Sequence, residues 1–571
     1  MRMLSLLLVL VLLTGCGSVH IATVTTEEAT ALTQSVETVP IAEAHEIPYV
    51  SRFDTITEIR LSDSSITVNG GKETDAVYTS SDIIYYEDRD TYESGNPYGE
   101  GEDWQRHTAE EAAAHTVVNI TAPGAYRIGG KLSAGQIRID LGEDAYDDPN
   151  AVVELILSDA DITCTVAPAI LFLNTYECDG NWSEDTARPD VDTSDAGANL
   201  ILEGNNTVNG SHVAKIFKDN DKEKKLWKQD GAIYSYMSMN LEGSGRLELN
   251  ADNEGMDTEL HLTLNGGEIF ICSGNDGINT NEDGVSVTTI NGGQLTIFAG
   301  LDKEGDGIDS NGYLVINGGT VISAAHPAAD AGLDSDLGSF IHGGTVIAMG
   351  STMDWAESDS KQVTINLQFA SQQKAGSKIT ITGEDGIEIF SFENGGQYAR
   401  TFNGLIFSAP ALKRSETYNV FVDGVQMSYT GTDVGGFSGG FGGRPSGQMP
   451  EEFNPSQTGG RDKRPEEGQM PEGFEGFGKK RPEDMDRGEM PEGFEPGQLP
   501  EDFEGFGKKR PEGMDRGEMP EGFEPGKMPP GQLPEDFEGF SGPGAQSNSK
   551  ARTEFYMNDM VNSFSGVKAA D

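Results

Sequence analysis

The feature that most constrains the fold is a pair of coupled repeats in the middle of the chain. Asn-Gly-Gly, with His in the last copy, recurs at residues 265–267, 291–293, 317–319 and 342–344, that is at intervals of 26, 26 and 25. A second motif runs in phase with it and consists of glycine, an apolar residue, Asp or Asn, Ser or Thr, and another acid or amide. Its copies are residues 255–259, 277–281, 307–311 and 332–336. Coupled motifs at a fixed period predict a fold built from stacked repeats.

The length of the period selects among repeat folds. Short alternating apolar stretches between glycine corners leave no room for the helical crossovers of an open parallel sheet. A propeller blade needs ~40–50 residues, which is more than one repeat contains. In a parallel solenoid each repeat forms one turn, and the paired glycines form corners where φ is positive or the backbone is crowded. We therefore predict an all-β chain with a parallel β-helix over residues 46–434. The regular turns lie at 230–350, and an irregular β cap follows them.

Alternation along the strands of this solenoid places acids and amides in two outward columns. In the second motif the apolar residue and the small Ser or Thr face inward, so the residues between and after them face outward. The two columns are Asp257, Asn279, Asp309 and Asp334, and Glu259, Asn281, Asn311 and Asp336. Carboxylates stacked at about 5 Å repel by roughly 3 kcal/mol at an effective dielectric constant of 20. The columns therefore require a counter-ion or protonation.

Calcium matches the chemistry of these columns. It takes oxygen ligands from Asp, Glu, Asn and backbone carbonyls in flexible geometry, whereas the His and Cys ligands typical of zinc are missing from the two columns. Residues just before each motif, such as Asp276, Asp306 and Asp330, close the sites from the loop side. A ladder of side chains that only hydrogen-bond one another remains the alternative. The predicted calcium ligands are Asp257, Glu259, Asn279, Asn281, Asp306, Asp309, Asn311, Asp334 and Asp336.

The charge balance limits the classes of partner. The chain has 94 acidic and 40 basic residues, for a formal net charge of −54. Nucleic acids and anionic lipid surfaces are therefore excluded as partners. The densest basic run of the predicted solenoid, Lys222, Lys224, Lys225 and Lys228, is diluted by neighbouring acids, and we interpret it as a solvated loop.

The N-terminus predicts export. Arg2 precedes an apolar run from Leu4 to Leu13 that is too short to cross a bilayer and is typical of a signal peptide. The run ends in Leu-Thr-Gly-Cys, which resembles the lipobox of bacterial lipoproteins and places the lipid on Cys16. We expect a signal peptide at 1–15 and a flexible linker at 16–45. The protein is then lipid-anchored at the cell surface and touches the membrane only through that lipid.

The remaining cysteines and the C-terminal region complete the organisation. Cys164, Cys178 and Cys272 are interpreted as buried thiols, and a Cys164–Cys178 disulfide is left as the alternative. Residues 435–552 are rich in Gly, Pro, Met, Phe and Glu and predict a disordered tail, which acts as a spacer or contacts surface proteins. In the last segment, 553–571, the apolar residues Met557, Met560, Val561 and Phe564 have helical spacing. They predict a short amphipathic helix over 553–567.

The repeat motifs also resemble a known family. The Asn-Gly-Gly corners and the sequence Asp-Gly-Ile-Asp-Ser-Asn-Gly at 306–312 are similar to bacterial carbohydrate-binding parallel β-helix proteins. The resemblance is close over 230–350 and looser from 150 to 430. It implies a right-handed, pectate-lyase-like solenoid that contains calcium and binds cellulose or pectic acid, in an exported and often lipid-anchored protein.

The sequence is compatible with polysaccharide binding and with two alternative functions. Lys303 is the one basic residue among the fifteen acids of 251–350, so the turns supply no evident base for a calcium-dependent lyase, and we assign no catalytic residue. We expect polysaccharide binding, with a non-catalytic surface scaffold or adhesin as the main alternative and a lyase as the other. Stacking on neutral glucans would use aromatic residues. The candidates are Trp182, Trp227, Trp355, Tyr234 and Tyr236.

Overall fold

A computed structural model describes most of the predicted solenoid and the end of the chain. The described residues are 49–86, 105–180, 183–184, 186–217, 225–302, 304–351, 353–394, 399–432 and 551–570. The predicted signal peptide, Cys16, the linker and almost all of the predicted tail lie outside them. The described part is almost entirely β-structure, with a short helix α2 (Ala109–Ala113) and a 3-10 turn η2 (Glu143–Asp147). It contains no helix that is long and apolar enough to cross a membrane.

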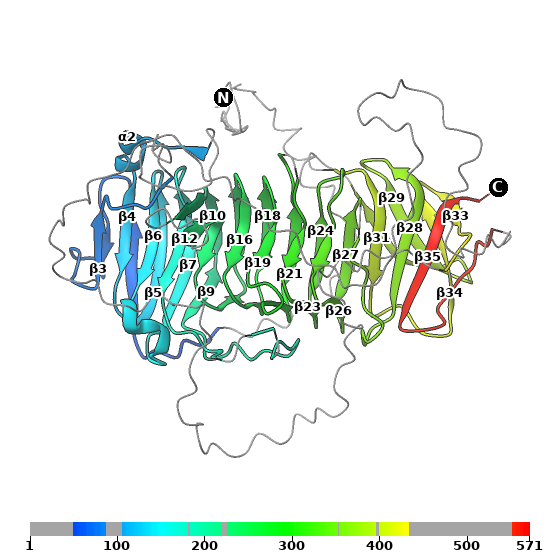
Figure 1. Ribbon diagram of the computed structural model, residues 1–571, viewed down its shortest axis with the longest axis horizontal. Coiled ribbons are helices and arrows are strands. Elements are labelled where there is room, and N and C mark those ends of the chain that lie inside the picture. The colour runs from blue at the N-terminus through cyan, green and yellow to red at the C-terminus, as the bar shows by residue number, and fades with distance from the viewer. Residues whose placement is uncertain are drawn as a thin grey trace, which may run out of the picture. The chain divides into compact units, whose positions relative to one another are not determined.

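Each repeat contributes three strands, and each strand pairs in parallel with its counterpart in the next repeat. Met256 pairs with Ile278, which pairs with Ile308. In the same way Leu249 pairs with Ile271, and Ile271 with Ile297. Strands of successive repeats therefore pair in parallel, and Figure 1 shows the strands following one another along the stack in sequence order.

The three columns of strands run the length of the stack. The first is a nine-stranded sheet, composed of β3 (Val77–Ser80), β4 (Thr116–Ile120), β6 (Gly135–Asp140), β8 (Ile170–Asn174), β13 (Gly231–Ser235), β16 (Glu254–Thr258), β19 (Ile278–Thr280), β22 (Ile308–Ser310) and β25 (Leu333–Ser335). The second contains β1 (Ile56–Leu61), β5 (Gly124–Leu132), β7 (Val153–Thr163), β9 (Ala198–Glu203), β14 (Met239–Gly243), β17 (Leu262–Leu264), β20 (Val287–Ile290), β23 (Tyr313–Ile316) and β26 (Gly338–Ile341). The third contains β10 (Asn205–Gly210), β15 (Arg246–Ala251), β18 (Glu268–Ser273), β21 (Gln294–Phe298), β24 (Thr320–Ala324) and β27 (Thr345–Gly350).

A few strands lie outside this regular pattern. The long strand β7 pairs with β9 through its first half and with β10 through its second, so it joins the second and third columns. Strand β2 (Thr67–Val68) pairs antiparallel with β1, and β3 of the first column pairs antiparallel with β4. Strands β11 (Val213–Phe217) and β12 (Lys225–Gln229) form a separate antiparallel hairpin between β10 and β13.

The interior is filled as the alternation predicts. The apolar residue of each second-motif copy lies in the main hydrophobic core, where Met256, Ile278 and Ile308 stack on one another. The small residues beside them are also buried, and Thr280 and Ser310 share a hydrogen bond of 2.9 Å between their hydroxyl oxygens. The polar stack is therefore internally satisfied.

The two glycine motifs serve different purposes. The second glycine of each Asn-Gly-Gly corner has a positive φ, as at Gly293 (83°) and Gly319 (78°), which glycine adopts without steric cost. The glycine before each apolar residue is instead required by close approach. A Cβ at Gly277 would lie 2.2 Å from Ile297 Cγ2 and 2.5 Å from the carbonyl oxygen of Gly307 in the next turn.

A mostly antiparallel module follows the last turn. It consists of β28 (Thr364–Gln373), β29 (Lys378–Gly383), β30 (Glu388–Glu393), β31 (Phe402–Ser408), β32 (Thr417–Val422), β33 (Val425–Ser428), β34 (Phe555–Tyr556) and β35 (Val561–Ala569). Strand β31 pairs antiparallel with β27 and joins the module to the solenoid. Outward apolar residues of the last turns, including Ile347 and Met349, share a hydrophobic core with Phe390 and Phe407 of the module.

The prediction of a C-terminal helix is wrong. Residues 561–569 form β35, which pairs in parallel with β28 and antiparallel with β33, and Phe564 and Val567 are buried in the module. Asn562, Ser563 and Gly566 are poor helix formers, and open positions beside β28 and β33 satisfy the backbone instead. Tertiary pairing therefore overrides the helical spacing of the apolar residues.

The described cysteines form no disulfide. Cys164 and Cys272 are buried and Cys178 is half-buried. Burial raises the pKa of the Cys164 thiol to about 12, so this thiol stays protonated and inert at neutral pH. The interpretation as buried thiols therefore holds for Cys164 and Cys272.

Replacing Gly277 by Ala tests the close packing of turns. Because the added methyl would overlap a backbone carbonyl, we expect G277A to lower the free energy of unfolding by about 2 kcal/mol or more. Chemical denaturation of the purified protein measures this loss. G180A is the matched control, since a Cβ at Gly180 meets nothing within 4 Å. Equal stability of the two variants would contradict the packing described for the turns.

Candidate metal centre

The outward columns of acids and amides exist, and their burial changes along the stack. Asp257 lies in register with Asn279, then Asp309, then Asp334. Asp257 is completely buried and Asn279 is 6% exposed, whereas Asp309 and Asp334 are half-buried and Asp336 is exposed. The columns therefore have a closed end at β16 and an open end at β25.

Two tyrosines continue the columns at the closed end. Tyr234 of β13 is in register with Asp257 and is fully buried. Its hydroxyl donates a hydrogen bond to Glu259, and its ring meets that of Tyr236 edge-on at 5.0 Å. Tyr234 therefore covers the acids and offers no ring face for stacking on a sugar.

The closed end contains a compact group of carboxylates. Asp230, Glu254 and Asp257 each place an oxygen within 4.8 Å of the other two. Asn279 donates to Glu254 Oε1 at 3.3 Å, and Asn281 donates to Asp257 Oδ1. We call these five residues the oxygen cluster.

Several oxygens of this cluster lack a partner. Glu254 Oε2, Asp257 Oδ2 and Asn279 Oδ1 are buried, and none of them has a hydrogen-bond partner among the described residues. A buried acceptor without a donor costs about 1–3 kcal/mol, and more when it is charged. The cluster therefore contains three buried oxygen atoms that are available to bind a cation.

The sequence-based prediction included acids just before the motif in later turns, such as Asp276 and Asp306, but missed Asp230 and Glu254. A signal for them exists. An acid stands directly before the motif glycine in successive turns, as Glu254, Asp276 and Asp306, and Asp230 precedes Gly231 of β13 in the same way. Because the strand register aligns Glu254, Asp276 and Asp306 across turns, they form a third polar column.

Burial governs the protonation of the columns. Loss of solvent, followed by the charge of Glu254, raises the pKa of Asp257 well above its usual range. Burial and neighbouring carboxylates likewise raise the pKa of Asp276 and Asp309, and burial raises that of Asp306 to about 7. Burial thus favours the neutral form of these carboxyl groups, whereas a bound cation would favour the charged form.

Backbone amides stabilise the acids of the middle turns. The backbone N–H of Asp306 donates to Asp276 Oδ1 at 2.7 Å, and that of Ala331 donates to Asp306 Oδ1 at 2.5 Å. Asn311 donates to the carbonyl oxygen of Asn281 at 2.9 Å. This part of the columns combines the predicted hydrogen-bonded ladder with half-exposed carboxylates.

The interpretation of Lys228 as part of a solvated loop is wrong. Its side chain is 20% exposed, and its ammonium lies 3.0 Å from Asp230 Oδ2. It also donates to Asn281 Oδ1. The lysine lies here because β12 leads straight into β13, which carries Lys228 over the closed end of the columns.

The residues of the cluster fit a hard divalent cation. The donors are carboxylate and amide oxygens, the three carboxylates place oxygens within 4.8 Å of one another, and three oxygens of the cluster are unpartnered and buried. This donor set suits calcium or magnesium and lacks the nitrogen and sulfur ligands that zinc prefers. Asp230, Glu254, Asp257, Asn279 and Asn281 could hold such an ion.

The tryptophans do not form a surface platform in the described part of the chain. Trp355 is 9% exposed and packs in the main hydrophobic core, so its ring cannot stack on a sugar from solvent. Trp182 lies outside the described residues, and only the backbone of Trp227, in β12, is described.

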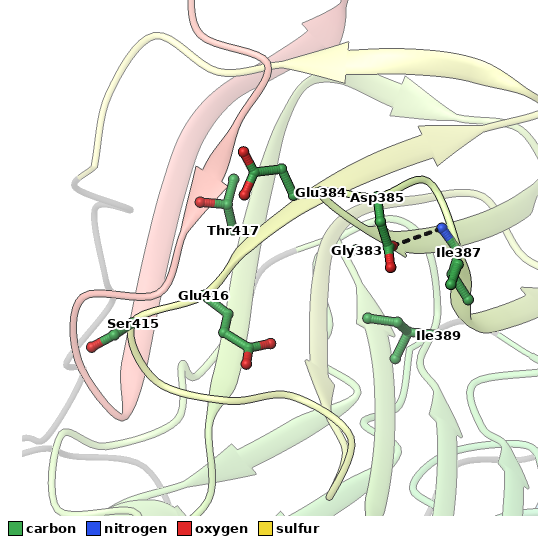
Figure 2. Close-up of a pocket in the computed structure, with 8 residues that line it drawn as sticks. All are labelled: Gly383, Glu384, Asp385, Ile387, Ile389, Ser415, Glu416 and Thr417. Carbon is green, nitrogen blue, oxygen red and sulfur yellow. Dashed lines mark hydrogen bonds between the residues drawn. The ribbon is translucent and has the colours of Figure 1, made fainter.

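A separate hollow lies in the antiparallel module. It has a volume of about 600 Å³ and is lined by residues of β29, β30, β32 and the adjoining turns. Figure 2 shows Asp385 turned toward the backbone nitrogen of Ile387, which donates to it at 3.0 Å. The hollow contains no residue of the acid and amide columns.

Comparison with known proteins supports the assignment to carbohydrate binding. Residues 114–395, just under half of the chain, match the sequence model of a family described as "carbohydrate-binding domain-containing protein". The solved structure of a polysaccharide lyase-like protein from C. thermocellum, a gadolinium derivative, is 20% identical; the match covers 51% of this chain and 93% of that one, with a TM-score of 0.29. No curated protein matches the chain. With a TM-score this low, the strand pairings alone define the architecture.

Replacing Asp354 by Asn tests whether a buried carboxyl group beside Ser335 and Ser339 makes stability depend on pH. Burial raises the pKa of Asp354 to about 7 from its ordinary value of 3.8, while Ser335 donates to it at 2.6 Å. The folded state thus binds one more proton than the unfolded state between these values. Stability is therefore greatest at low pH and is lost as pH rises toward 7, by up to about 1.4 kcal/mol per pH unit.

We expect D354N, which keeps the acceptor oxygen but cannot titrate, to flatten this slope. Urea midpoints at pH 5 and pH 8 in chelator measure it for both proteins. Because both proteins share every other titrating group, the difference between their slopes isolates Asp354. Identical slopes would show that Asp354 does not titrate in this range.

Proposed function

We propose that this protein is a calcium-stabilised, right-handed parallel β-helix that binds acidic polysaccharides. The observation that carries the proposal is the oxygen cluster with its unpartnered buried acceptors, continued along the same face by half-exposed carboxylates. A cation at the closed end stabilises the fold. A cation at the open end has part of its coordination free for a uronate of the glycan.

The family match supports a polysaccharide as the partner. Residues 114–395 contain every strand of the three columns from β4 onward, including the whole acid and amide face. The matched region therefore includes this face, which supports the proposal that the face binds the glycan.

The charge of the face favours acidic over neutral glycans. Asp309, Asp334 and Asp336 give the open end a negative charge, which repels a uronic acid unless a divalent cation bridges the two. A neutral glucan such as cellulose instead needs exposed aromatic rings, and Trp355 and Tyr234 are buried. We therefore place pectic or other uronic-acid polymers ahead of cellulose.

Binding is favoured over lyase chemistry by the state of Lys228. A lyase requires a base that removes the C5 proton of the uronate. Burial acts to lower the pKa of Lys228, but the charges of Asp257, Glu254 and Glu259 outweigh it and raise the pKa above its usual value. The ammonium thus keeps its proton and cannot serve as that base.

We also propose that the protein is exported and anchored at the cell surface through a lipid on Cys16. The support is the apolar run and the Leu-Thr-Gly-Cys sequence at the N-terminus. Expression in bacteria with a labelled fatty acid should label the wild-type protein, and C16S should remain unlabelled and unanchored. Label on C16S would contradict this assignment.

Calcium and glycan binding can be tested together. In calcium, we expect the wild-type protein to be retained by polygalacturonate and released by chelator, because the ion bridges two anions. Removing one open-end carboxylate in D309N or D334N should weaken retention at least about tenfold, equivalent to ~1.4 kcal/mol. The calcium-loaded protein should also melt at a higher temperature, since an ion present at ~100 times its Kd adds about 2.7 kcal/mol.

The matched control is E248Q, which removes an exposed acid from the outer face of β15 in another column. It should bind as the wild type does. Retention that survives chelator would contradict the calcium bridge. Release of unsaturated products from the polymer over time would instead identify a lyase.

A further inference from the structure

Lys228 already occupies the position where a cation would be most stable. Its ammonium contacts Asp230 Oδ2 at 3.0 Å and donates to Asn281, which in turn donates to Asp257. Asp230 and Asp257 belong to the group of carboxylates that could hold a metal ion. The lysine and a bound ion would therefore use the same oxygens.

The charges at the closed end explain why a lysine is tolerated there. Asp230 contacts the ammonium directly, and the charges of Asp257, Glu254, Glu259 and Asp276 also act on it. The lysine offsets one unit of negative charge. A divalent ion would offset two and would also supply a partner for the orphaned oxygens Glu254 Oε2 and Asp257 Oδ2.

We propose that Lys228 is a built-in competitor of the divalent cation, and that it sets the affinity and the charge selectivity of the oxygen cluster. This inference rests on the proposed function, because it concerns the same cation site. A divalent ion bound at Asp230 would lie close to the ammonium and repel it, so ion binding favours departure of the ammonium. Rotation about the four methylene groups of the lysine is sufficient, since the side chain already reaches the surface with 20% of its area.

Competition makes the site selective for divalent ions. A sodium or potassium ion would bring the same positive charge to the cluster as the ammonium of Lys228, which is already held there by the chain. Replacing the ammonium by such an ion therefore stabilises the cluster little. A divalent ion gains one unit of charge and more ligands. The lysine therefore keeps the cluster closed to monovalent ions and stabilises the fold when divalent ions are scarce.

Calcium titration of the full-length protein tests the competition. The wild type is compared with K228M, which keeps the apolar stem and removes the charge, and with K228R, which keeps the charge. If the ammonium occupies the site most of the time, its removal should lower the Kd for calcium about tenfold or more, whereas K228R should bind no more tightly than the wild type. K131M is the matched control because Lys131 also pairs with an aspartate, Asp161, on the surface at 2.5 Å, and its Kd should stay unchanged.

A second measurement follows the lysine itself and does not depend on a variant folding. Acetylation of the wild-type protein, quantified by mass spectrometry, should modify Lys228 several-fold faster in calcium than in chelator, while Lys131 reacts equally in both. Without calcium, K228M should melt at a lower temperature than the wild type, and calcium should remove that difference.

The outcomes separate this inference from the proposed function. The competition would be overturned if the wild type and K228M bound calcium with the same Kd and if calcium did not change the acetylation rate of Lys228. The calcium site itself would still be supported by that result. Calcium binding by K228M alone would support the competition in its strongest form. Absence of calcium binding in both proteins would overturn both proposals.

Discussion

Stacking of equivalent residues at the spacing between hydrogen-bonded strands governs this structure. In a parallel solenoid each residue lies ~4.8 Å from its counterpart in the next turn. Apolar residues gain from this geometry, because Met256, Ile278 and Ile308 form a continuous core inside the turns. Carboxylates are destabilised by it, because like charges accumulate along the outer face. The three polar columns of this protein are the place where the conflict has to be resolved.

The structure relieves this repulsion differently along the stack. At the closed end, Asn279 and Asn281 replace acids in the columns, and Lys228 supplies a positive charge. In the middle turns, backbone N–H groups donate to Asp276 and Asp306. At the open end, solvent reaches Asp336. The buried oxygens at the closed end still lack a hydrogen-bond partner within the described part of the chain. Because a cation would supply that partner, we expect cation binding to raise the stability of the fold.

The end of the chain completes the antiparallel module. Tyr429 and Arg552, on either side of the low-complexity sequence, exchange two backbone hydrogen bonds of 2.8 and 3.0 Å. The segment between them is therefore an insertion into the module and not a terminal tail. Because β34 and β35 follow this insertion and pack Phe555 and Phe564 against Tyr429, the module requires the last residues of the chain. Its own apolar core then covers the outward face of β24 and β27.

The sequence by itself determined the stacked turns, their inward residues and the outward columns, because a fixed period and strict alternation are local properties that stacking only repeats. It could not determine which parts of those columns are buried. Lys228 and Asp230 reach Asp257 only because the β11–β12 hairpin leads into β13, and Trp355 is buried only because the chain folds back on the last turns. Likewise β35 is a strand because β28 and β33 offer unpaired edges, which the spacing of Met557 and Phe564 does not reveal. Periodicity therefore determined the position of each residue on a turn, and contacts between segments distant in sequence decided its exposure, its partner and its charge.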